Sequence, residues 1–277
     1  MSDILSSVGH RKWPLPDTPW SMTQRWNDLL FAHWPVPAAE IAYLLPEGLE
    51  IDTFDGSAWV GVVPFWMDAI RLRGMPAIPG VNRFPELNLR TYVRERNTNS
   101  EGVYFFSLDA GNLIAVAFAR TFFHLPYYWS NMRIFHRGDG SLFYRSERRF
   151  GNPARFHAAY RSLRRLRVIG QSRPGTIEYF LTERYCLYTA DRRGRLLKGN
   201  IHHLPWPLES AEAEIEINEL PQAHGIRLPD IPPLVHYARQ LSVYVWALEP
   251  AQALEIWNPA TAKQAAQPAA PPISLAR

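Results

Sequence analysis

The sequence predicts an α+β, mainly β fold, and three observations support this prediction. The 24 prolines and 16 glycines recur at short intervals along the chain. The segments between them are rich in Val, Tyr, Phe and Trp, which favour strands. The few helix-like segments do not alternate regularly with the strands, as they would in a parallel α/β fold. A mostly antiparallel sheet with interspersed helices is therefore expected.

Hydrophobic spacing along the chain assigns the individual elements. Apolar residues at helical spacing predict helices over 24–31, 38–44 and 112–122, and over part of 179–188. Short β-branched and aromatic runs between turn residues predict strands. The predicted strands cover 58–65, 86–94, 103–108, 142–149, 154–160, 213–217 and 241–248.

Length and composition predict a single domain. The chain has 277 residues, of which 47% are apolar, and this is ample for one large core. We expect residues 1–19 to form an extended N-terminal arm and residues 20–250 to form the domain. Ala, Gln and Pro dominate the last residues, so we expect 251–277 to be a tail, disordered from about 261 onward.

The composition also suggests a cellular setting. The single cysteine, Cys186, excludes an intramolecular disulfide, and the first residues lack the apolar stretch of a secretory signal. The longest apolar run, 113–119, is too short to cross a bilayer. We therefore expect a cytoplasmic protein that has no membrane partner and could form homo-oligomers.

The basic residues are almost all arginine. The formal charge is +4, and 27 of the 30 basic residues are arginine, which stays charged when buried and suits carboxylate recognition. A genomic bias toward G and C is a second explanation. The cluster Arg161, Arg164, Arg165 and Arg167 alternates with apolar residues, and no nucleic-acid motif accompanies it. We expect a solvated face there and no nucleic-acid partner.

Four motifs carry a resemblance to a known family. They are LLPEGL at 44–49, PELNLRTYV at 85–93, TERYCLYT at 182–189 and HHLPWPL at 202–208. Over roughly residues 20–250 the chain resembles the YqjF-like family, domain of unknown function 2071, in the acetoacetate decarboxylase-like superfamily. The resemblance implies a cone-shaped, mostly antiparallel β-barrel with a few flanking helices and an interior cavity for a small molecule.

The turn FHLPYY at 123–128 limits the chemistry that the resemblance implies. In acetoacetate decarboxylases the matching turn carries a proline and two lysines, the first of which forms the Schiff base. Tyr127 and Tyr128 stand at these places here. Of the three lysines only Lys198 lies well within the chain, and the adjacent Gly-Asn signal predicts an exposed turn. The resemblance thus implies a protein that is not a Schiff-base acetoacetate decarboxylase.

The strand over 86–94 has one polar face. Strand alternation places Glu86, Asn88, Arg90 and Tyr92 on the same side. This row is either an ordinary solvated face or the lining of a cavity. The resemblance favours the cavity, because the family pattern has a functional glutamate at the place of Glu86. We therefore expect Glu86 to be catalytic, Arg90 to be its partner or an anion clamp, and Tyr92 to contact the ligand.

The tyrosine turn supplies further candidates. Tyr127 could act as a general acid or oxyanion donor if a cation such as Arg120 lies beside its hydroxyl. Packing of two tyrosines at a proline turn is the alternative. We include Arg120, His124 and Tyr128 with the candidate ligand-binding residues because they surround Tyr127 in the sequence.

The histidines favour acid–base or binding roles over a metal site. Adjacent strand residues point to opposite faces, so His202 and His203 cannot chelate one ion, and the chain lacks paired histidines at metal-binding spacing. We expect no metal and no cofactor. His203 is a candidate acid or base, His202 and His33 are candidate ligand contacts, and backbone bonding at the following turn is the alternative for the pair.

Three functions from different classes fit these features. The first is an enzyme that acts on a small organic acid or carbonyl compound by acid–base or lyase-type chemistry without a Schiff base. The second is a binding or sensing module that uses the same cavity without catalysis. The third is an interaction protein that presents its aromatic residues at the surface. Glu183 and Arg184 are expected to form a structural ion pair on a helical turn.

Overall fold

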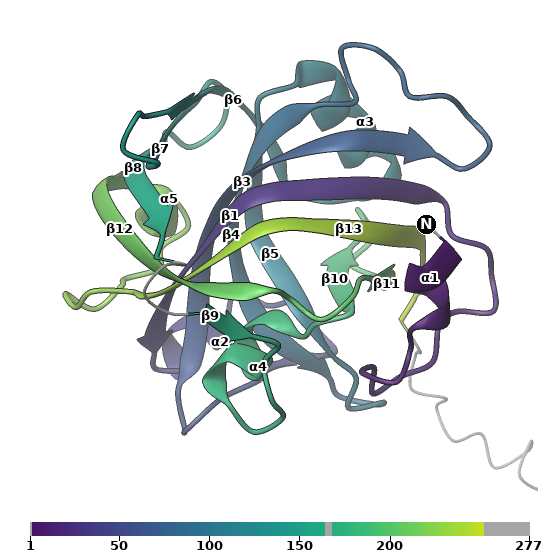
Figure 1. Cartoon of the computed structure of the whole chain (residues 1–277). Coiled ribbons are helices and arrows are strands. Elements are labelled where there is room, and N and C mark those ends of the chain that lie inside the picture. The colour runs from purple at the N-terminus through teal and green to yellow at the C-terminus, as the bar shows by residue number, and fades with distance from the viewer. Residues whose placement is uncertain (1, 164–167, 252–277) are drawn as a thin grey trace, which may run out of the picture.

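The computed structural model describes residues 2–163 and 168–251, which form five helices and thirteen strands (Figure 1). The helices are α1 Ser2–Ser6, α2 Ala39–Ala42, α3 Leu113–Phe122, α4 Ile177–Thr182 and α5 Leu220–Ala223. The strands are β1 Met22–Val36, β2 Leu49–Ile51, β3 Ala58–Leu72, β4 Phe84–Glu95, β5 Glu101–Ala110, β6 Tyr127–His136, β7 Leu142–Arg148, β8 Arg155–Ser162, β9 Val168–Gly170, β10 Cys186–Ala190, β11 Leu196–His202, β12 Leu208–Asn218 and β13 Leu234–Pro250.

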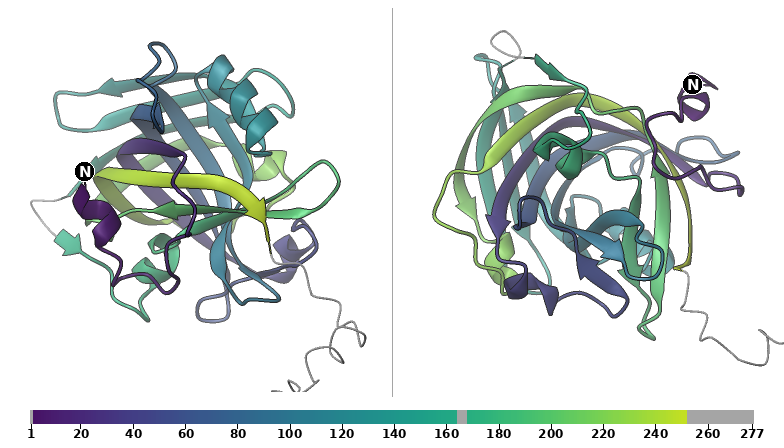
Figure 2. Two further views of the ribbon diagram at one scale, coloured as in Figure 1. Left: turned by 90° about the vertical axis from the view of Figure 1, so that its right-hand side faces the viewer. Right: turned by 90° about the horizontal axis from the view of Figure 1, so that it is seen from below.

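The strands form one sheet that closes on itself. Neighbouring strands follow the order β2, β4, β3, β1, β13, β11, β10, β5, β6, β7, β8, β12, β9, and β4 also pairs with β5. That additional pairing closes a seven-strand ring of β4, β3, β1, β13, β11, β10 and β5, which Figure 2 shows from below. Within the ring only β5 and β10 pair in parallel. The strands β6, β7, β8 and β12 lead from β5 back to β13.

The central strand β4 is covered on both faces. Leu87 and Leu89 pack into a core cluster with Tyr144 of β7 and Phe156 of β8. The alternate residues of β4 point to the inside of the ring, as strand geometry requires. Burial on both faces holds β4 rigidly, so side chains on its inner face are well positioned for a site.

The expected mainly β, α+β fold is confirmed. All seven predicted strands overlap β3, β4, β5, β7, β8, β12 or β13, and α2 and α3 match two predicted helices. Asn112 caps α3 by accepting a hydrogen bond from the backbone of Ala115. The helix within 179–188 is α4, which begins two residues earlier and ends at Thr182. The β-branched and aromatic runs did not predict the strands β2, β6, β9, β10 and β11.

The helix predicted over 24–31 is wrong, because these residues lie in β1. Asp28 has a φ of 52°, and the register of β1 with β3 is interrupted between Asn27 and Ala32. Such a bulge shifts the alternation of the strand. Leu29 and Leu30 are both buried, since each face of β1 meets other parts of the protein. Two-sided burial and the bulge together produce apolar spacing that imitates a helix.

The ion pair predicted between Glu183 and Arg184 is also wrong. The Arg184 guanidinium donates to Asp52 at 2.7 Å and to the carbonyl oxygen of Phe180 at 2.8 Å. Glu183 accepts a hydrogen bond from the backbone nitrogen of Trp206 at 3.1 Å. The two residues follow the end of α4 and bond to different parts of the fold, although they are adjacent in sequence.

The N-terminal segment begins with a helix rather than as the extended arm that was predicted. After α1, the guanidinium of Arg11 donates to the carbonyl oxygen of Ile201 at 2.8 Å, which fastens the segment to the ring. The tail expected to be disordered lies outside the described residues from 252 onward. The domain boundaries at 20 and 250 stay a prediction.

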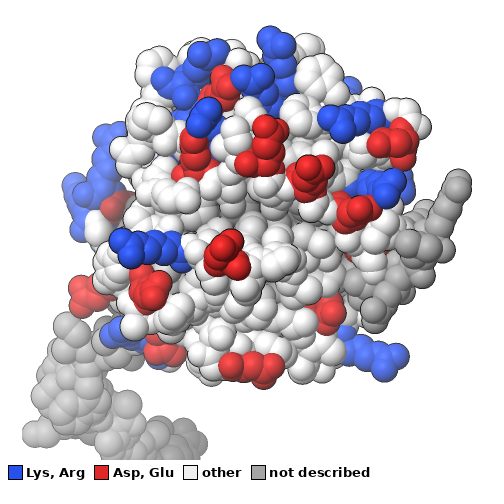
Figure 3. Space-filling view, turned by 90° about the vertical axis from the view of Figure 1, so that its left-hand side faces the viewer, with Lys and Arg blue, Asp and Glu red and all other residues white. Residues whose placement is uncertain are grey.

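Charges of both signs are interspersed on the face drawn in Figure 3. From the predicted basic cluster, Arg161 pairs with Glu212 at 2.7 Å, whereas Arg164, Arg165 and Arg167 lie outside the described residues. Within residues 2–163 and 168–251, the helices are too short or too polar to cross a membrane.

Candidate functional site

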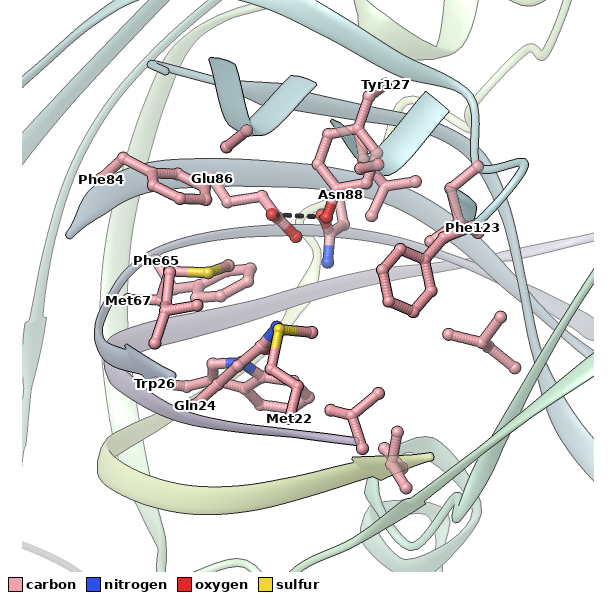
Figure 4. Close-up of a pocket in the computed structure, with 18 of the residues that line it drawn as sticks. Met22, Gln24, Trp26, Phe65, Met67, Phe84, Glu86, Asn88, Phe123 and Tyr127 are labelled. Atoms are coloured by element: carbon pink, nitrogen blue, oxygen red, sulfur yellow. Dashed lines mark hydrogen bonds between the residues drawn. The ribbon is translucent and has the colours of Figure 1, made fainter. Parts of the chain in front are cut away.

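A cavity of about 290 Å³ lies inside the seven-strand ring, and every strand of the ring contributes to its lining. Most of this lining is apolar or aromatic, as Figure 4 shows for one part of it. The apolar lining includes Trp26, Leu29, Val63, Phe65, Met67, Phe84, Val103, Phe105, Leu108, Phe123, Leu125, Leu187, Ile201, Trp206 and Val245. The polar lining residues are fewer: Gln24, Arg71, Glu86, Asn88, Arg90, Tyr127, Thr182, Arg184 and His203.

The inner face of β4 supplies the polar wall. Glu86, Asn88 and Arg90 line the cavity, and the intervening Leu87 and Leu89 point to the core on the other side. The structure thus places three of the four residues of the predicted polar row in one cavity.

Glu86 and Tyr127 form the central polar contact. The Tyr127 hydroxyl donates to Glu86 Oε2 at 2.8 Å, and the two side chains face each other across the cavity wall in Figure 4. Only 3% of Glu86 is exposed. Burial raises the pKa of Glu86 to about 8, while hydrogen bonds from Tyr127 and Asn88 oppose this rise. The carboxyl is therefore mostly protonated at neutral pH.

Tyr127 remains a phenol in this environment. Burial, together with the adjacent Glu86 carboxyl, raises the pKa of Tyr127 well above its ordinary value. The predicted cation beside its hydroxyl is wrong, because the Arg120 guanidinium is exposed and donates to the backbone carbonyl of Tyr127 at 3.3 Å. Tyr127 is consequently a hydrogen-bond donor to Glu86 rather than a proton donor activated by a cation.

Strand alternation explains why the two tyrosines differ. Tyr127 pairs with Leu108 at the start of β6 and points into the ring. Tyr128 points the opposite way, and the Arg148 guanidinium lies over its ring at 3.8 Å from the centroid. The predicted ligand contact at Tyr128 is thus outside the cavity, where its ring packs on a buried cation.

Arg90 lines the cavity together with two other described arginines, Arg71 and Arg184. Its Nη2 donates to the Tyr92 hydroxyl and to the carbonyl oxygen of Leu181, each at 3.2 Å, and its buried Nε has no partner. Among the described residues it forms no ion pair, so the predicted partnership with Glu86 is wrong. Arg90 therefore carries a positive charge that no nearby carboxylate neutralises.

His33 and Tyr92 lie behind Arg90 and do not line the cavity. The Tyr92 hydroxyl donates to the carbonyl oxygen of Leu181 at 2.7 Å, and His33 Nε2 lies 2.7 Å from the same hydroxyl. Because that hydroxyl proton is already donated, His33 Nε2 is its hydrogen-bond donor. Burial, and next the charge of Arg90, lowers the pKa of His33 well below its ordinary value. His33 and Tyr92 position Arg90 instead of contacting a ligand directly.

The two adjacent histidines have different surroundings. His203 lines the cavity, but its Nδ1 lies 2.7 Å from the carbonyl oxygen of Leu204, and burial lowers its pKa to about 3. His202 lies outside the cavity under the N-terminal segment, with Nε2 at 2.7 Å from the carbonyl oxygen of Ile4. His124 is also outside the lining and sits in the turn after α3 with a φ of 48°. The predicted ligand contacts at His202 and His124 are not supported by this placement.

Sequence reasoning placed Asn88 in the polar row but missed Trp206, Thr182 and Arg184 as lining residues. The indole nitrogen of Trp206 and Oδ1 of Asn88 are buried without a partner, and both residues line the cavity. Thr182 and Arg184 line its inner end near Arg90. The HHLPWPL motif contains Trp206, but nothing in its spacing indicates that the indole turns inward. A bound molecule could satisfy these unpartnered atoms.

No lysine belongs to the cavity lining in the described part of the chain. Lys198 lies in β11 rather than in an exposed turn, and its Nζ donates to Ser100 Oγ at 3.0 Å. Within the same described ranges, no three His, Cys, Asp or Glu side chains are grouped closely enough to hold a metal ion.

The cavity opens between α3 and the segment that joins β3 to β4. Six residues at this mouth line the cavity and are also exposed: Arg71, Met75, Pro76, Ile78, Ile114 and Phe118. All of them except Arg71 are apolar. A ligand that enters the cavity therefore passes a mostly apolar mouth that carries one cation before it reaches Glu86.

The amino-acid sequence matches one family over most of its length. The DUF2071 family, described as an uncharacterized conserved protein, matches residues 23–242. The uncharacterized protein YqjF of Bacillus subtilis (strain 168) is 47% identical over 234 residues, which cover 84% of this chain and 94% of that protein.

Solved structures show a similar fold at low identity. An acetoacetate decarboxylase-like enzyme from Sphingomonas wittichii RW1 has a TM-score of 0.59 at 13% identity, covering 85% of this chain and 94% of the other. The enduracididine biosynthesis enzyme MppR, complexed with pyruvate, has a TM-score of 0.59 at 11% identity, and the match covers 86% of this chain and 93% of MppR. An acetoacetate decarboxylase has a TM-score of 0.57 at 13% identity, and the match covers 92% of this chain and 99% of the decarboxylase. The chain thus belongs to the DUF2071 family and has an acetoacetate decarboxylase-like fold.

Proposed function

We propose that the cavity binds a small carboxylate or carbonyl compound and that Glu86 performs acid–base chemistry on it without a Schiff base. The observation that supports this proposal is the buried Glu86 carboxyl, which has a pKa of about 8 and accepts a hydrogen bond from Tyr127. A carboxyl with this pKa exchanges protons readily near neutral pH. Its apolar surroundings strengthen each hydrogen bond to a substrate.

The proposed chemistry begins with protonation of a carbonyl oxygen. Glu86 donates its proton to that oxygen while a water molecule in the cavity takes the proton of an adjacent C–H bond, or while a carboxylate on the adjacent carbon leaves as CO₂. In each case the electrons of the broken bond form the C=C bond of the product. The product is an enol, and the Glu86 carboxylate that results is stabilised by the hydrogen bonds from Tyr127 and Asn88. This sequence describes an enolisation or a lyase-type cleavage, and it requires no amine.

Arg90 provides the proposed anion contact. Guanidinium offers two parallel donors to a carboxylate, and Arg90 has no competing ion pair in the described residues. Arg184, at the same end of the cavity, is already paired with Asp52. The structurally similar enzyme MppR is complexed with pyruvate, and this supports an oxo acid as the class of ligand here.

Solvent exchange tests the proposal without knowledge of the product. We expect the protein to accelerate exchange of the α-hydrogens of oxo acids in D₂O, measured by proton NMR over a screen of chain lengths. Glu86→Gln should reduce the exchange rate at least a hundredfold, since it removes the acid–base group. The exposed Glu216→Gln is the matched control and should exchange as the parent does.

Borohydride trapping tests the absence of a Schiff base. Treatment with borohydride and an oxo acid should leave the intact mass unchanged, because no lysine lines the cavity in the described residues. A stable adduct on Lys198 would show that an amine reaches the substrate and would overturn the proposed mechanism.

Binding without catalysis is the second candidate function. The mostly apolar lining and the unpartnered indole of Trp206 favour it, since both suit a ligand that is held rather than transformed. An oxo acid that binds tightly but neither exchanges nor reacts would support this module in place of the enzyme.

A further inference from the structure

We infer that the cavity accepts an elongated oxo acid, in which several carbons separate the carboxylate from the carbonyl. This inference rests on the proposed function, because it takes Arg90 as the carboxylate contact and Glu86, held by Tyr127, as the carbonyl contact. Of the two proposed reactions it fits enolisation, since a distant carboxylate is not attached to the carbon beside the carbonyl. It adds the spacing between the two groups. That spacing follows from the position of the contacts along β4.

The two polar contacts are far apart on the strand. Glu86 and Arg90 are four residues apart, so their Cα atoms are separated by about 13 Å at about 3.3 Å per residue. The Arg90 guanidinium bonds to Tyr92, two residues farther from Glu86 along β4, whereas the Glu86 carboxyl bonds to Tyr127 and to Asn88. A 2-oxo acid has its two polar groups on neighbouring atoms and is too short to bridge a separation of this order.

The wall between the contacts is suited to a hydrocarbon chain. Asn88 lies midway, and its direct neighbours on the adjacent strands are Val63 and Leu108. Both neighbours line the cavity. Asn88 Oδ1 is an unpartnered acceptor at this level, with Val63 and Leu108 on either side, so a chain that passes here meets mostly apolar groups.

The order of groups from the mouth inward sets the orientation of the ligand. β4 begins at Phe84 beside the exposed mouth residues Met75 and Ile78, and Glu86 follows. Arg90 lies at the inner end with Leu181. The carboxylate therefore enters first, and the carbonyl stays nearer the mouth. The cavity of about 290 Å³ holds about ten water-sized volumes, so a three-carbon acid would leave most of its apolar surface uncovered.

Positional isomers of one oxo acid test this spacing. The 2-oxo, 5-oxo and 7-oxo isomers of octanoate have the same atoms and charge and differ only in the distance between carbonyl and carboxylate. Isothermal titration calorimetry on the full chain near neutral pH should show that the 5-oxo or the 7-oxo isomer binds at least tenfold more tightly than the 2-oxo isomer. Octanoate, which lacks the carbonyl, should bind more weakly than the preferred isomer.

Neighbouring tyrosines provide a matched pair of variants. Tyr127→Phe should reduce the preference among isomers, since it removes the hydroxyl that holds the Glu86 carboxyl in place. Tyr128→Phe makes the same change outside the cavity and should retain the preference. Arg90→Lys should weaken binding of all three isomers by a similar factor, because each keeps its carboxylate.

Two results would overturn the inference. One is tightest binding by the 2-oxo isomer, and the other is an isomer preference that Tyr127→Phe leaves unchanged. Either result would leave the proposed chemistry standing if α-hydrogen exchange depends on Glu86. Conversely, tighter binding of the 5-oxo or 7-oxo isomer without any α-hydrogen exchange would support the inferred distance between carbonyl and carboxylate. It would contradict the proposed reaction.

Discussion

Glu86 shows how burial decides the state of a single residue. Desolvation favours the neutral carboxyl, and the nearby charge of Asp109 adds to this effect. Tyr127 and Asn88 donate hydrogen bonds that favour the charged form, but burial outweighs them. The protein therefore maintains a proton-carrying group at neutral pH in a position that a solvated glutamate could not provide.

The pH dependence of stability reports this state. The folded pKa of about 8 exceeds the ordinary 4.5, so the folded protein binds the Glu86 proton more tightly than the unfolded chain. The contribution of Glu86 to the free energy of unfolding is fully present below about pH 4.5 and is lost as pH rises to about 8. The rise in pKa corresponds to up to about 5 kcal/mol, at about 1.4 kcal/mol per pH unit. Glu86→Gln should therefore become more stable relative to the parent across this window.

Urea denaturation at several pH values measures the difference. The exposed Glu216→Gln is the control, because it changes the same group without burial. A difference between Glu86→Gln and the parent that stays constant from pH 5 to pH 9 would contradict a raised pKa at this site.

A double-mutant cycle separates the contacts of Glu86. Glu86 and Tyr127 share a hydrogen bond, so Glu86→Gln and Tyr127→Phe should couple by about 1 to 3 kcal/mol in the free energy of unfolding. Glu86 and Arg90 do not touch, so Glu86→Gln and Arg90→Met should add within about 0.5 kcal/mol. Chemical denaturation of the single and double variants gives both values. Strong coupling in the second cycle would show that the residues share a contact after all.

At the scale of elements, close approach of neighbouring strands positions the anion contact. Gly61 of β3 pairs with His33 of β1 on one side and with Arg90 of β4 on the other. A Cβ at Gly61 would lie 2.8 Å from His33 Nε2, closer than packed atoms allow. The missing side chain leaves room for His33 to reach Tyr92, which in turn orients Arg90.

Gly61→Ala tests this arrangement. We expect it to cost about 1 to 3 kcal/mol of stability, because His33 is buried and cannot move without disturbing its neighbours. It should also weaken binding of carboxylates through the displacement of Arg90. Gly138→Ala is the control, since a Cβ there meets nothing within 4 Å. Thermal denaturation measures the stability and calorimetry measures carboxylate binding. Equal stability and equal binding in Gly61→Ala and Gly138→Ala would contradict the role proposed for Gly61.

At the scale of the whole molecule, a buried ion pair joins the ring to the strands outside it. Asp109 of β5 and Arg148 of β7 are 2.8 Å apart, and both side chains are fully buried. The Arg148 guanidinium also lies over the Tyr128 ring. Tyr128 thus shields the pair, which gives the second tyrosine of the turn a structural role.

Removing one member of the pair should be costly. Asp109→Ala leaves Arg148 buried and unpaired, so we expect a loss of about 3 to 5 kcal/mol in the free energy of unfolding. Glu212→Ala, which breaks the exposed pair with Arg161, should cost less than about 1 kcal/mol. Urea denaturation of both variants makes the comparison. Similar losses would mean that the buried pair contributes no more than a surface pair.

Local sequence determined the class of fold and the composition of the polar wall. Alternation along β4 assigned Glu86, Asn88 and Arg90 to one face, because strand geometry fixes side-chain direction over a few residues. The prolines, glycines and β-branched runs likewise predicted most of the long strands. The motifs at 44–49, 85–93, 182–189 and 202–208 identified the family, which the family match over residues 23–242 confirms.

Only the tertiary structure decided which residues meet. Tyr127 and Glu86 are 41 residues apart in sequence, and closing the ring brings them into hydrogen-bond contact. The bulge at Asp28 and the burial of both faces made β1 resemble a helix, since spacing alone does not reveal what covers a segment. His202 and His203 are equivalent in the sequence, whereas the chain around them turns one toward the cavity and the other beneath the N-terminal segment. Contacts between distant segments depend on strand pairing, and no local pattern encodes that pairing.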